Sequence, residues 1–457
     1  MNKPHAPNSW EARAMDNVMA GFTDFPTLHE RGPVVLTHGK GVRVYDTHGR
    51  DYLDANSGLW NVVCGWDHEG LIEAMVEQTR RFPAYHAFFG RMSDTSVELS
   101  EKLVEVSPFR TGRVFFTNSG SEANDTMVKM LWMMNRAEGN PARRKIITRI
   151  NSYHGVTAVS ASMTGKPYNE HFGLPLPGFI HADCPHYWRF GEEGETEADF
   201  TARIARNLEA LIEKEGPETI AGFFAEPVMG AGGVIPPSEG YFRAIQPILK
   251  KYGIPLIADE VICGFGRTGA VWGADTYAIR PDAIIASKAL TCGFMPLGAV
   301  ILGDEFAERM QKAAESIEEF PHGFTSSGHP VACAVGLKSI EIILDGGLLD
   351  NVKKISPYFM KRLKALLDHP LGGEARGVGL MGALEVVADK KSKTPFDGSL
   401  SVSERIANAC LDQGLICRPL GQSVVLCPPF IMDEPLLDEM YGKLETALDK
   451  VAAELKI

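Results

Sequence analysis

Short hydrophobic runs alternate with segments of helical periodicity through the middle of the chain. The runs are β-branched or apolar and lie at 113–118, 145–150, 219–227, 254–260, 283–289 and 298–302. Most are separated by segments such as DFTARIARNLEALIEKEG, 199–216, in which apolar positions recur at helical spacing. This alternation predicts βα units and therefore an α/β fold, with a mostly parallel sheet covered by helices on both faces.

The two ends of the chain have different patterns. Residues 34–55 alternate and turn like short antiparallel strands. Beyond residue 330 we expect helices and a small α+β module, with helices at 330–344, 350–368, 402–413 and 435–455 and strands in GVGLMGALEVV and LICRPLGQSVVLCPP. The sequence thus predicts a large αβα domain over 60–330. A smaller α+β domain would combine the N-terminal segment 1–59 with the C-terminal residues 331–457.

Composition excludes several classes of protein. The 457 residues are 44% hydrophobic and 23% charged, which is typical of a globular chain. A net charge of -12 without a long basic run argues against a nucleic-acid surface. The cysteines form no C-x-x-C pair, so we expect no zinc site, no other metal and no disulfide framework. No apolar stretch reaches the about 20 residues that a membrane helix needs, and no signal peptide is evident, so we expect a cytoplasmic protein.

Polar residues stand where the predicted strands end, and ligands bind at the carboxyl ends of strands in open parallel sheets. They are Ser119, Gly120, Ser121, Tyr153, His154, Glu226, Asp259 and Lys288. Lys288 ends an apolar run with no acid nearby. A desolvated lysine has a lowered pKa and can form a Schiff base, although a lysine that reaches out to solvent would fit the same position.

Asp259 and the segment around Ser119 are compatible with a phosphorylated pyridine ring. A buried carboxylate keeps a pyridinium nitrogen protonated, whereas an ordinary turn cap is the alternative for Asp259. Glu260 should point to the opposite face because side chains alternate along a strand. The helix after Ser119 carries an apolar stripe of Ala123, Met127, Met130, Leu131 and Met134. Its N-terminus can bind phosphate or simply be capped by Ser119 and Glu122.

Two glycine-rich strings indicate nucleotide sites that we reject. Gly264, Gly266 and Gly269 match G-x-G-x-x-G, but residues 261–263 intervene after the strand and AVWGAD is a poor helix start. A nicotinamide oxidoreductase is therefore a remote alternative. In HGFTSSGHP, His329 replaces the lysine of a phosphate-binding P-loop. Phe324 and Thr325 remain as candidate phosphate contacts in that loop.

The motifs together resemble those of a known family. SGSEAND, NSYHG, AEPVMGAGG, ADEVICGFGRTG, IIASKAL and HGFTSSGHP occur in this order in the class III aminotransferases, which are fold-type I pyridoxal-phosphate enzymes. GFTDFP, NSGLWN, YHAFFGRMS and GLICRPLGQSVVLCPPF look most like the amine:pyruvate (omega-) transaminases. The resemblance covers nearly the whole chain. It implies transfer of an amino group from a primary amine or omega-amino acid to pyruvate or a similar keto acid, giving alanine and a ketone or aldehyde. A class III decarboxylase or aminomutase is the alternative.

The resemblance also implies roles for individual residues. Lys288 would hold pyridoxal 5'-phosphate as a Schiff base and move protons, and Asp259 would pair with the ring nitrogen. The other cofactor contacts would be Ser119, Gly120, Ser121, Tyr153, His154, Glu226, Val261, Phe324 and Thr325. The substrate pocket would comprise Phe22, Leu59, Trp60, Phe88, Phe89 and Ala231, with Arg418 as a mobile arginine for the keto acid's carboxylate. Because Thr325 would come from a neighbouring subunit, we expect a homodimer with shared active sites, which could pair into tetramers. Cys292 and Met295 lie near the lysine, where relatives vary.

Overall fold

A seven-stranded sheet forms the centre of the computed structural model, which describes residues 6–457, so the first five residues of the predicted N-terminal segment lie outside it. The strand order is β4-β10-β9-β8-β7-β5-β6. The strands are β4 (Gly112–Thr117), β5 (Lys145–Arg149), β6 (Phe179–Ala182), β7 (Ile220–Ala225), β8 (Leu256–Asp259), β9 (Ala283–Ala286) and β10 (Gly298–Gly303). β10 runs antiparallel to both its neighbours and the remaining pairs are parallel. The predicted mostly parallel sheet is confirmed.

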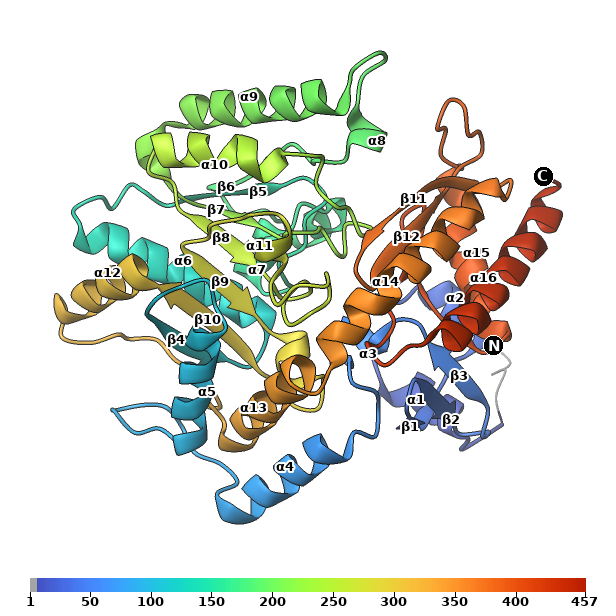
Figure 1. The fold of residues 1–457 in the computed structure, drawn as a ribbon, viewed down its shortest axis with the longest axis horizontal. Helices are drawn as coiled ribbons and strands as arrows, with labels where there is room; N and C mark the ends of the chain where they lie inside the picture. Colours follow the sequence, from blue (N-terminus) through green and yellow to red (C-terminus); the bar gives the residue numbers. More distant parts are fainter. Residues whose placement is uncertain (1–5) are drawn as a thin grey trace.

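Helices cover both faces of this sheet (Figure 1). Apolar residues of α9 (Glu197–Glu215) and α10 (Tyr241–Lys251) share a core with Phe223 of β7. On the other face, α6 (Gly120–Ala137) and α12 (Asp304–Glu315) pack over Phe224. The predicted stripe on α6 is buried along its whole length because it is the surface that meets the sheet.

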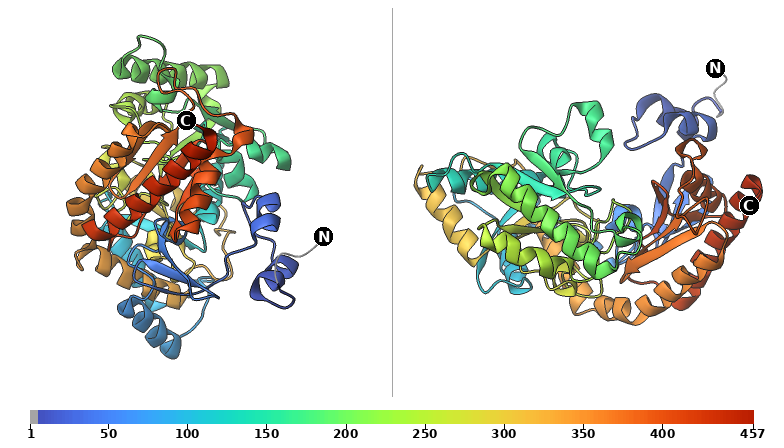
Figure 2. Two further views of the ribbon diagram at one scale, coloured as in Figure 1. Left: turned by 90° about the vertical axis from the view of Figure 1, so that its right-hand side faces the viewer. Right: turned by 90° about the horizontal axis from the view of Figure 1, so that it is seen from above.

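The C-terminal third forms a second layered unit beside the large sheet (Figures 1 and 2). α13 (Pro330–Leu344) and α14 (Leu348–Ala365) lead into a sheet of order β11-β12-β15-β14. Its strands are β11 (Gly372–Val378), β12 (Met381–Val386), β14 (Arg418–Leu420) and β15 (Ser423–Leu426), and α15 (Val402–Asp412) and α16 (Glu434–Leu455) complete the unit. The helices and strands predicted beyond residue 330 are present.

The N-terminal strands join the C-terminal third rather than the large sheet. β1 (Leu36–Lys40), β2 (Arg43–Asp46) and β3 (Asp51–Asp54) form an antiparallel meander, and β13 (Leu415–Ile416) adds to β3 in parallel. The remaining helices are α1 (Trp10–Asn17), α2 (Phe25–Arg31), α3 (Ser57–Trp60), α4 (Glu69–Arg81), α5 (Asp94–Glu105), α7 (Ala158–Met163), α8 (Tyr187–Phe190) and α11 (Gly273–Thr276). Within residues 6–457, no helix is long and apolar enough to cross a membrane.

Candidate functional site

Asp259, at the end of β8, organises the centre of the candidate site. Its side chain is 3% exposed. Its Oδ2 lies 2.7 Å from Nδ1 of His154 and accepts a 2.9 Å hydrogen bond from Nδ2 of Asn124, while Oδ1 accepts one from the Val261 amide at 3.2 Å. The ends of β5 and β8 and the first turn of α6 therefore meet at one carboxylate.

Asn124 was not among the predicted site residues. Its side chain is buried, and besides binding Asp259 its Nδ2 donates to the carbonyl oxygen of His154 at 2.8 Å. Burying an amide side chain on the apolar face of a helix costs free energy unless the amide is hydrogen-bonded. An asparagine among the apolar residues of this helix was therefore the signal in the sequence that could have identified Asn124. Nε2 of His154 is buried without a protein partner, so this edge of the site can still donate or accept a hydrogen bond.

Glu260 points away from Asp259, as alternation along the strand predicts. Its carboxylate accepts hydrogen bonds from the amides of Gly273 and Ala274 at 2.9 and 2.6 Å. Burial raises the pKa of Glu260 to about 8, although those two amides favour the charged form. Glu260 thus caps the start of α11, and Asp259 alone of the pair belongs to the pocket.

The N-terminus of α6 retains free amides. Ser119 Oγ accepts a 3.2 Å hydrogen bond from the Glu122 amide, but Glu122 Oε2 accepts from Asn118 rather than from Ser119, so only half of the expected capping box forms. The amides of Gly120 and Ser121 find no hydrogen-bond partner among the described residues. Two free amides at the positive end of an 18-residue helix fit a phosphate group.

Gly120 also permits a close approach between α6 and the segment after β8. A Cβ at this position would lie 2.8 Å from Cγ2 of Val261, closer than side-chain atoms pack. Val261, two residues beyond Asp259, is therefore held against the start of the helix. The structure brings the two free amides, the Asp259 carboxylate and this apolar side chain to the same place.

Lys288 lies two residues after the end of β9 with a φ of 50°, in the left-handed region. Its Nζ lies 5.2 Å from the centroid of the Trp60 ring. Within the described part of the chain, no hydrogen bond or ion pair engages this ammonium. Burial, together with the positive charge of Arg418, lowers the pKa of Lys288 to about 8. A substantial fraction of the amine is consequently neutral near physiological pH.

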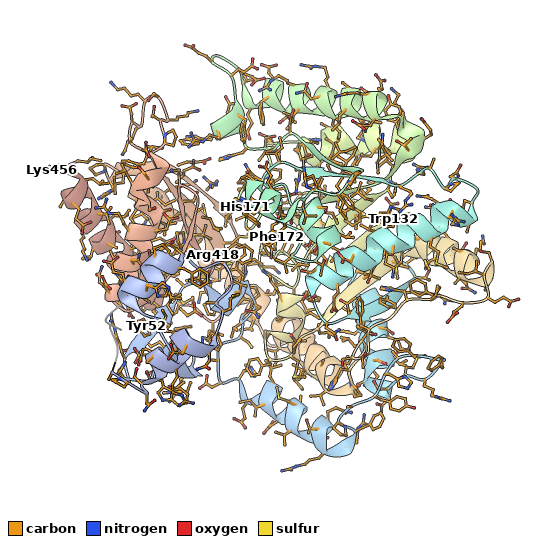
Figure 3. The ribbon with its side chains drawn as sticks, turned by 180° about the vertical axis from the view of Figure 1, so that it is seen from behind. Tyr52, Trp132, His171, Phe172, Arg418 and Lys456 are labelled. Carbon is orange, nitrogen blue, oxygen red and sulfur yellow. The ribbon has the colours of Figure 1, made fainter. Side chains whose placement is uncertain are left out.

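Arg418, on β14, lies over the same indole ring, with its Cζ 5.0 Å from the Trp60 centroid. Figure 3 shows it at the boundary between the C-terminal sheet and the seven-stranded sheet. Burial lowers the pKa of Arg418, and Tyr153 and Tyr168 oppose that effect. No carboxylate pairs with this guanidinium among residues 6–457, so a half-buried cation is available for an anion.

Glu226 ties the end of β5 to the loop after β7. Its Oε1 accepts a 3.0 Å hydrogen bond from the Tyr153 amide and its Oε2 a 2.9 Å bond from the Gly230 amide. A Cβ at Gly230 would lie 2.9 Å from Cζ3 of Trp60, so the loop fits closely against the indole. Ala231 follows in the same loop and is buried in the same apolar cluster as Trp60.

Two further pocket residues escaped prediction. Burial raises the pKa of Tyr168 to about 12, with Tyr153 acting in the same direction. Burial lowers the pKa of Lys166, which Glu226 opposes. Both are close enough to Arg418 for its charge to act on them, yet nothing in the local sequence distinguishes them from ordinary loop residues.

Several predicted pocket residues face outward in the single chain. Phe22, Leu59 and Phe89 are 70%, 56% and 83% exposed. Phe88 packs against Gly323, where a Cβ would lie 2.5 Å from its Cζ. Phe324 is half-buried beside His322, and Thr325 is exposed. One chain therefore places Trp60 beside Lys288 and Ala231 in the same cluster as Trp60, while Phe22, Leu59, Phe89 and Thr325 are exposed.

The GFGRTG segment is a turn that contacts the C-terminal unit. Arg267 is buried, and its Nη1 donates to the carbonyl oxygens of Leu380 and Pro428 at 2.9 and 2.6 Å. The next helix, α11, is four residues long and begins only at Gly273. A dinucleotide fingerprint needs its glycines to open a helix, so the rejection of that motif is confirmed.

The chain matches a family and several solved structures. Residues 27–448 match the family described as class-III aminotransferases. A gamma aminobutyrate transaminase from Solanum lycopersicum is 44% identical over 96% of this chain and 86% of its own length. A PMP-bound aminotransferase from Vibrio fluvialis superposes with a TM-score of 0.97 at 68% identity, over 98% of this chain and 100% of that one. An omega-aminotransferase from Paracoccus denitrificans gives a TM-score of 0.97 at 69% identity, over 98% and 99%.

Proposed function

We propose, on the premise that this chain belongs to the class III aminotransferase family, that its amino acceptor is pyruvate or a similar short keto acid. The chain is a pyridoxal-phosphate-dependent aminotransferase with a fold-type I architecture, and its substrates are an amine and a keto acid. The proposed donor is a primary amine or an omega-amino acid, so the products would be alanine and a ketone or aldehyde. One observation carries the proposal: Arg418 and Lys288 share the Trp60 ring, and Arg418 has no carboxylate partner among the described residues.

The residues at the strand ends fit the cofactor. When bound, pyridoxal phosphate supplies an electron sink for the carbon that carries the amino group. We propose that Lys288 holds it covalently, that Asp259 keeps its ring nitrogen protonated, and that the free amides at the start of α6 bind its phosphate. Tyr153 and Val261 would lie on its two faces. Ser119, His154 and Glu226 would complete the site.

Lys288 suits proton transfer because burial lowers its pKa to about 8. A base with a pKa near the working pH is efficient both at accepting a proton and at returning it. Its Nζ would remove a proton from the carbon that bears the amino group and deliver it one step later. Since the same nitrogen serves both half-reactions, its loss should stop both.

One pocket has to accept an apolar amine and a carboxylate in turn. Trp60 and Ala231 supply an apolar wall against which a hydrocarbon substituent of the amine can pack. Arg418 supplies a planar fork for a carboxylate, and burial strengthens that interaction. With an amine bound, the guanidinium keeps its contact with the indole ring, so an apolar substrate does not leave this cation without a favourable contact.

We also propose a homodimer in which Phe324 and Thr325 serve the neighbouring active site. The exposed Phe22, Leu59 and Phe89 support this proposal, because large exposed apolar groups mark interaction surfaces. Light scattering measures the mass of the particle in solution. Mixed dimers of Lys288→Ala and Thr325→Ala chains should regain activity at one site in two, whereas a chain with self-sufficient sites would regain none.

Two further proposals concern organisation and compartment. We propose a large domain over 60–330 and a smaller one that combines the N-terminal segment up to residue 59 with 331–457. The pairing of β3 with β13 supports it, although α13 packs against α4 and α5 and bridges the boundary. All eight cysteines are unpaired, which supports a cytoplasmic location. Limited proteolysis and cell fractionation test these two proposals.

Product analysis tests the proposed reaction. With 1-phenylethylamine as a simple apolar amine and pyruvate as acceptor, we expect ketone and alanine in equal amounts over many turnovers. Without pyruvate, ketone should stop at one equivalent per active site. Continued turnover of an amino-acid donor without any keto acid would favour a decarboxylase or aminomutase and would overturn the proposal.

A further inference from the structure

Arg376, a buried residue of β11, reaches from the C-terminal sheet to a loop of the seven-stranded unit. Its Nε donates to the carbonyl oxygens of Gly233 and Val234 at 3.0 and 3.1 Å, and its Nη2 donates to Gly233 at 2.7 Å. Gly233 and Val234 belong to the loop after β7 that also carries Ala231. One side chain therefore joins the C-terminal sheet to a wall of the pocket.

The same guanidinium is bound firmly on its own side. Nη1 donates to Glu374 and Glu385, both at 2.6 Å, and Nη2 donates to Oγ of Ser423 at 2.8 Å. Ser423 opens β15, which pairs with β14 so that Arg418 lies opposite Val425. Arg376 is thus connected, through one hydroxyl and one strand, to the hairpin that carries Arg418.

The loop gripped by Arg376 is fixed independently of it. Met229 and Ile235 exchange two backbone hydrogen bonds at 3.0 and 2.9 Å, and Glu226 holds the Gly230 amide at 2.9 Å. Removing Arg376 would leave these bonds in place. The hairpin with Arg418 is held in its own sheet by the pairing of β15 with β12. The part that can shift is consequently the C-terminal sheet as a whole, which carries Arg418 with it, while the Ala231 wall would stay where it is.

A second contact crosses the same boundary. His186, from the segment before α8, lies with its Nε2 2.8 Å from Glu374, and Arg189 of α8 donates to Glu385. His186, Glu374 and Glu385 lie within 4.8 Å of one another, as metal ligands do. Two guanidinium groups already neutralise both carboxylates, so the cluster acts as an ion-pair network that holds Arg376 in its rotamer.

We propose that Arg376 is a positioning residue that sets the distance between Arg418 and the Ala231 wall, and so controls affinity for the carboxylate of the keto acid. The inference rests on the proposed role of Arg418. Misplacement of a binding group by about 1 Å can cost up to about 100-fold in rate. The apolar amine touches the fixed wall, and its half-reaction would be spared.

The test uses the holoenzyme and separates the two half-reactions. Arg376→Met and the charge-retaining Arg376→Lys are compared with the parent by stopped-flow absorbance, using 1-phenylethylamine for one half and pyruvate for the other. Calorimetric titration with propanoate, a carboxylate that cannot react, gives a readout independent of turnover. Arg362→Met is the matched control: Arg362 pairs with Asp438 and Glu445 of the same C-terminal unit.

For Arg376→Met we expect propanoate and pyruvate to bind about 10-fold more weakly, with the amine half-reaction within about twofold of the parent. The affinity of Arg376→Lys for the two carboxylates should lie between those of the parent and Arg376→Met, and the affinity of Arg362→Met should equal that of the parent. If Arg376→Met does not fold, Ser423→Ala takes its place, because it removes only the hydrogen bond between Arg376 and β15. The same two half-reactions and propanoate binding are then measured on Ser423→Ala. Equal losses in both half-reactions, or unchanged propanoate binding, would overturn the inference.

Arg418→Ala separates this inference from the proposed function. If that variant binds propanoate as tightly as the parent, Arg418 is not the carboxylate site, and both proposals fail together. If it loses propanoate binding while Arg376→Met retains it, only the positioning role fails. Loss of propanoate binding in both variants, with the amine half-reaction intact in both, supports the two proposals.

Discussion

Nδ1 of His154 lies 2.7 Å from Oδ2 of Asp259, and both side chains are buried at the carboxyl edge of the sheet. This contact and the hydrogen bond from Asn124 fix the orientation of the Asp259 carboxylate. A fixed carboxylate is what a protonated ring nitrogen needs in a buried site. His154 and Asn124 therefore hold Asp259 in one orientation, in which we propose that it pairs with the ring nitrogen of the cofactor.

Asp259→Asn should slow the amine half-reaction by about 100- to 1,000-fold, because an amide does not hold the ring nitrogen in its protonated form. Stopped-flow absorbance of the loaded enzyme measures the rate. Asp304→Asn, at an exposed carboxylate bound to Thr111, serves as control and should behave as the parent. A loss of only a few-fold in Asp259→Asn would show that the carboxylate is not needed for the chemistry.

Capture of the cofactor by the apoenzyme should follow the protonation of Lys288. Only the neutral amine attacks an aldehyde, and burial lowers the pKa of Lys288 to about 8. The capture rate should thus rise with pH through a midpoint near 8 and level off above it. Arg418 contributes to the lowered pKa, so Arg418→Leu should move the midpoint to higher pH. A midpoint near about 10.4, typical of an unperturbed lysine, contradicts this assignment.

Gly120→Ala should weaken cofactor binding by at least about 10-fold, because the new methyl group would collide with Val261 and displace the phosphate-binding amides. Equilibrium dialysis of the apoenzyme measures the affinity. Adding Val261→Ala makes room for the methyl and should restore part of the loss. Gly442→Ala, where the Cβ meets open space within a helix, is the control. Unchanged affinity in the single variant would refute the phosphate site.

Arg418→Ala should weaken the use of pyruvate by about 10- to 100-fold, the value of hydrogen bonds from a charged donor. The use of a simple apolar amine should change far less, since that substrate has no carboxylate. Steady-state kinetics with each substrate varied in turn gives the two KM values. Equal losses for both substrates would remove Arg418 from carboxylate recognition.

Arg267→Met should destabilise the fold while leaving the reacting groups in place. The change removes hydrogen bonds to two buried carbonyl oxygens, at Leu380 and Pro428, which costs about 2–4 kcal/mol. The midpoint of urea unfolding should fall, and kcat at low temperature should stay close to that of the parent. A stable variant with lost activity would mean that the GFGRTG turn serves the chemistry directly.

The sequence predicted the strands of the large sheet well because each is a short apolar run. It missed β6, because this strand has only four residues and follows directly on the proline-rich LPLPG. The sequence also did not predict that β10 runs antiparallel to its neighbours. The direction of a strand depends on how the chain connects it to the preceding strand and not on the residues of the strand itself. The motifs identified Asp259, Lys288 and the start of α6 because chemistry there requires particular residue types.

Other parts of the site could not be derived from local patterns. Arg376 binds Gly233, which is far away in the chain, and the charge of the equally distant Arg418 acts on the pKa of Tyr168. Phe22 and Phe89 were predicted as pocket residues, yet a single chain exposes them. In the proposed homodimer their environment would depend on how two chains associate, which no periodicity along one sequence encodes.

The visible spectrum of the loaded protein tests the central claim most directly. Purified protein should take up pyridoxal phosphate and turn yellow, lose that colour on addition of 1-phenylethylamine, and regain it with pyruvate while alanine forms in equal amount. Protein that takes up no pyridoxal phosphate, or that bleaches with the amine and does not recover its colour with pyruvate, would contradict the account.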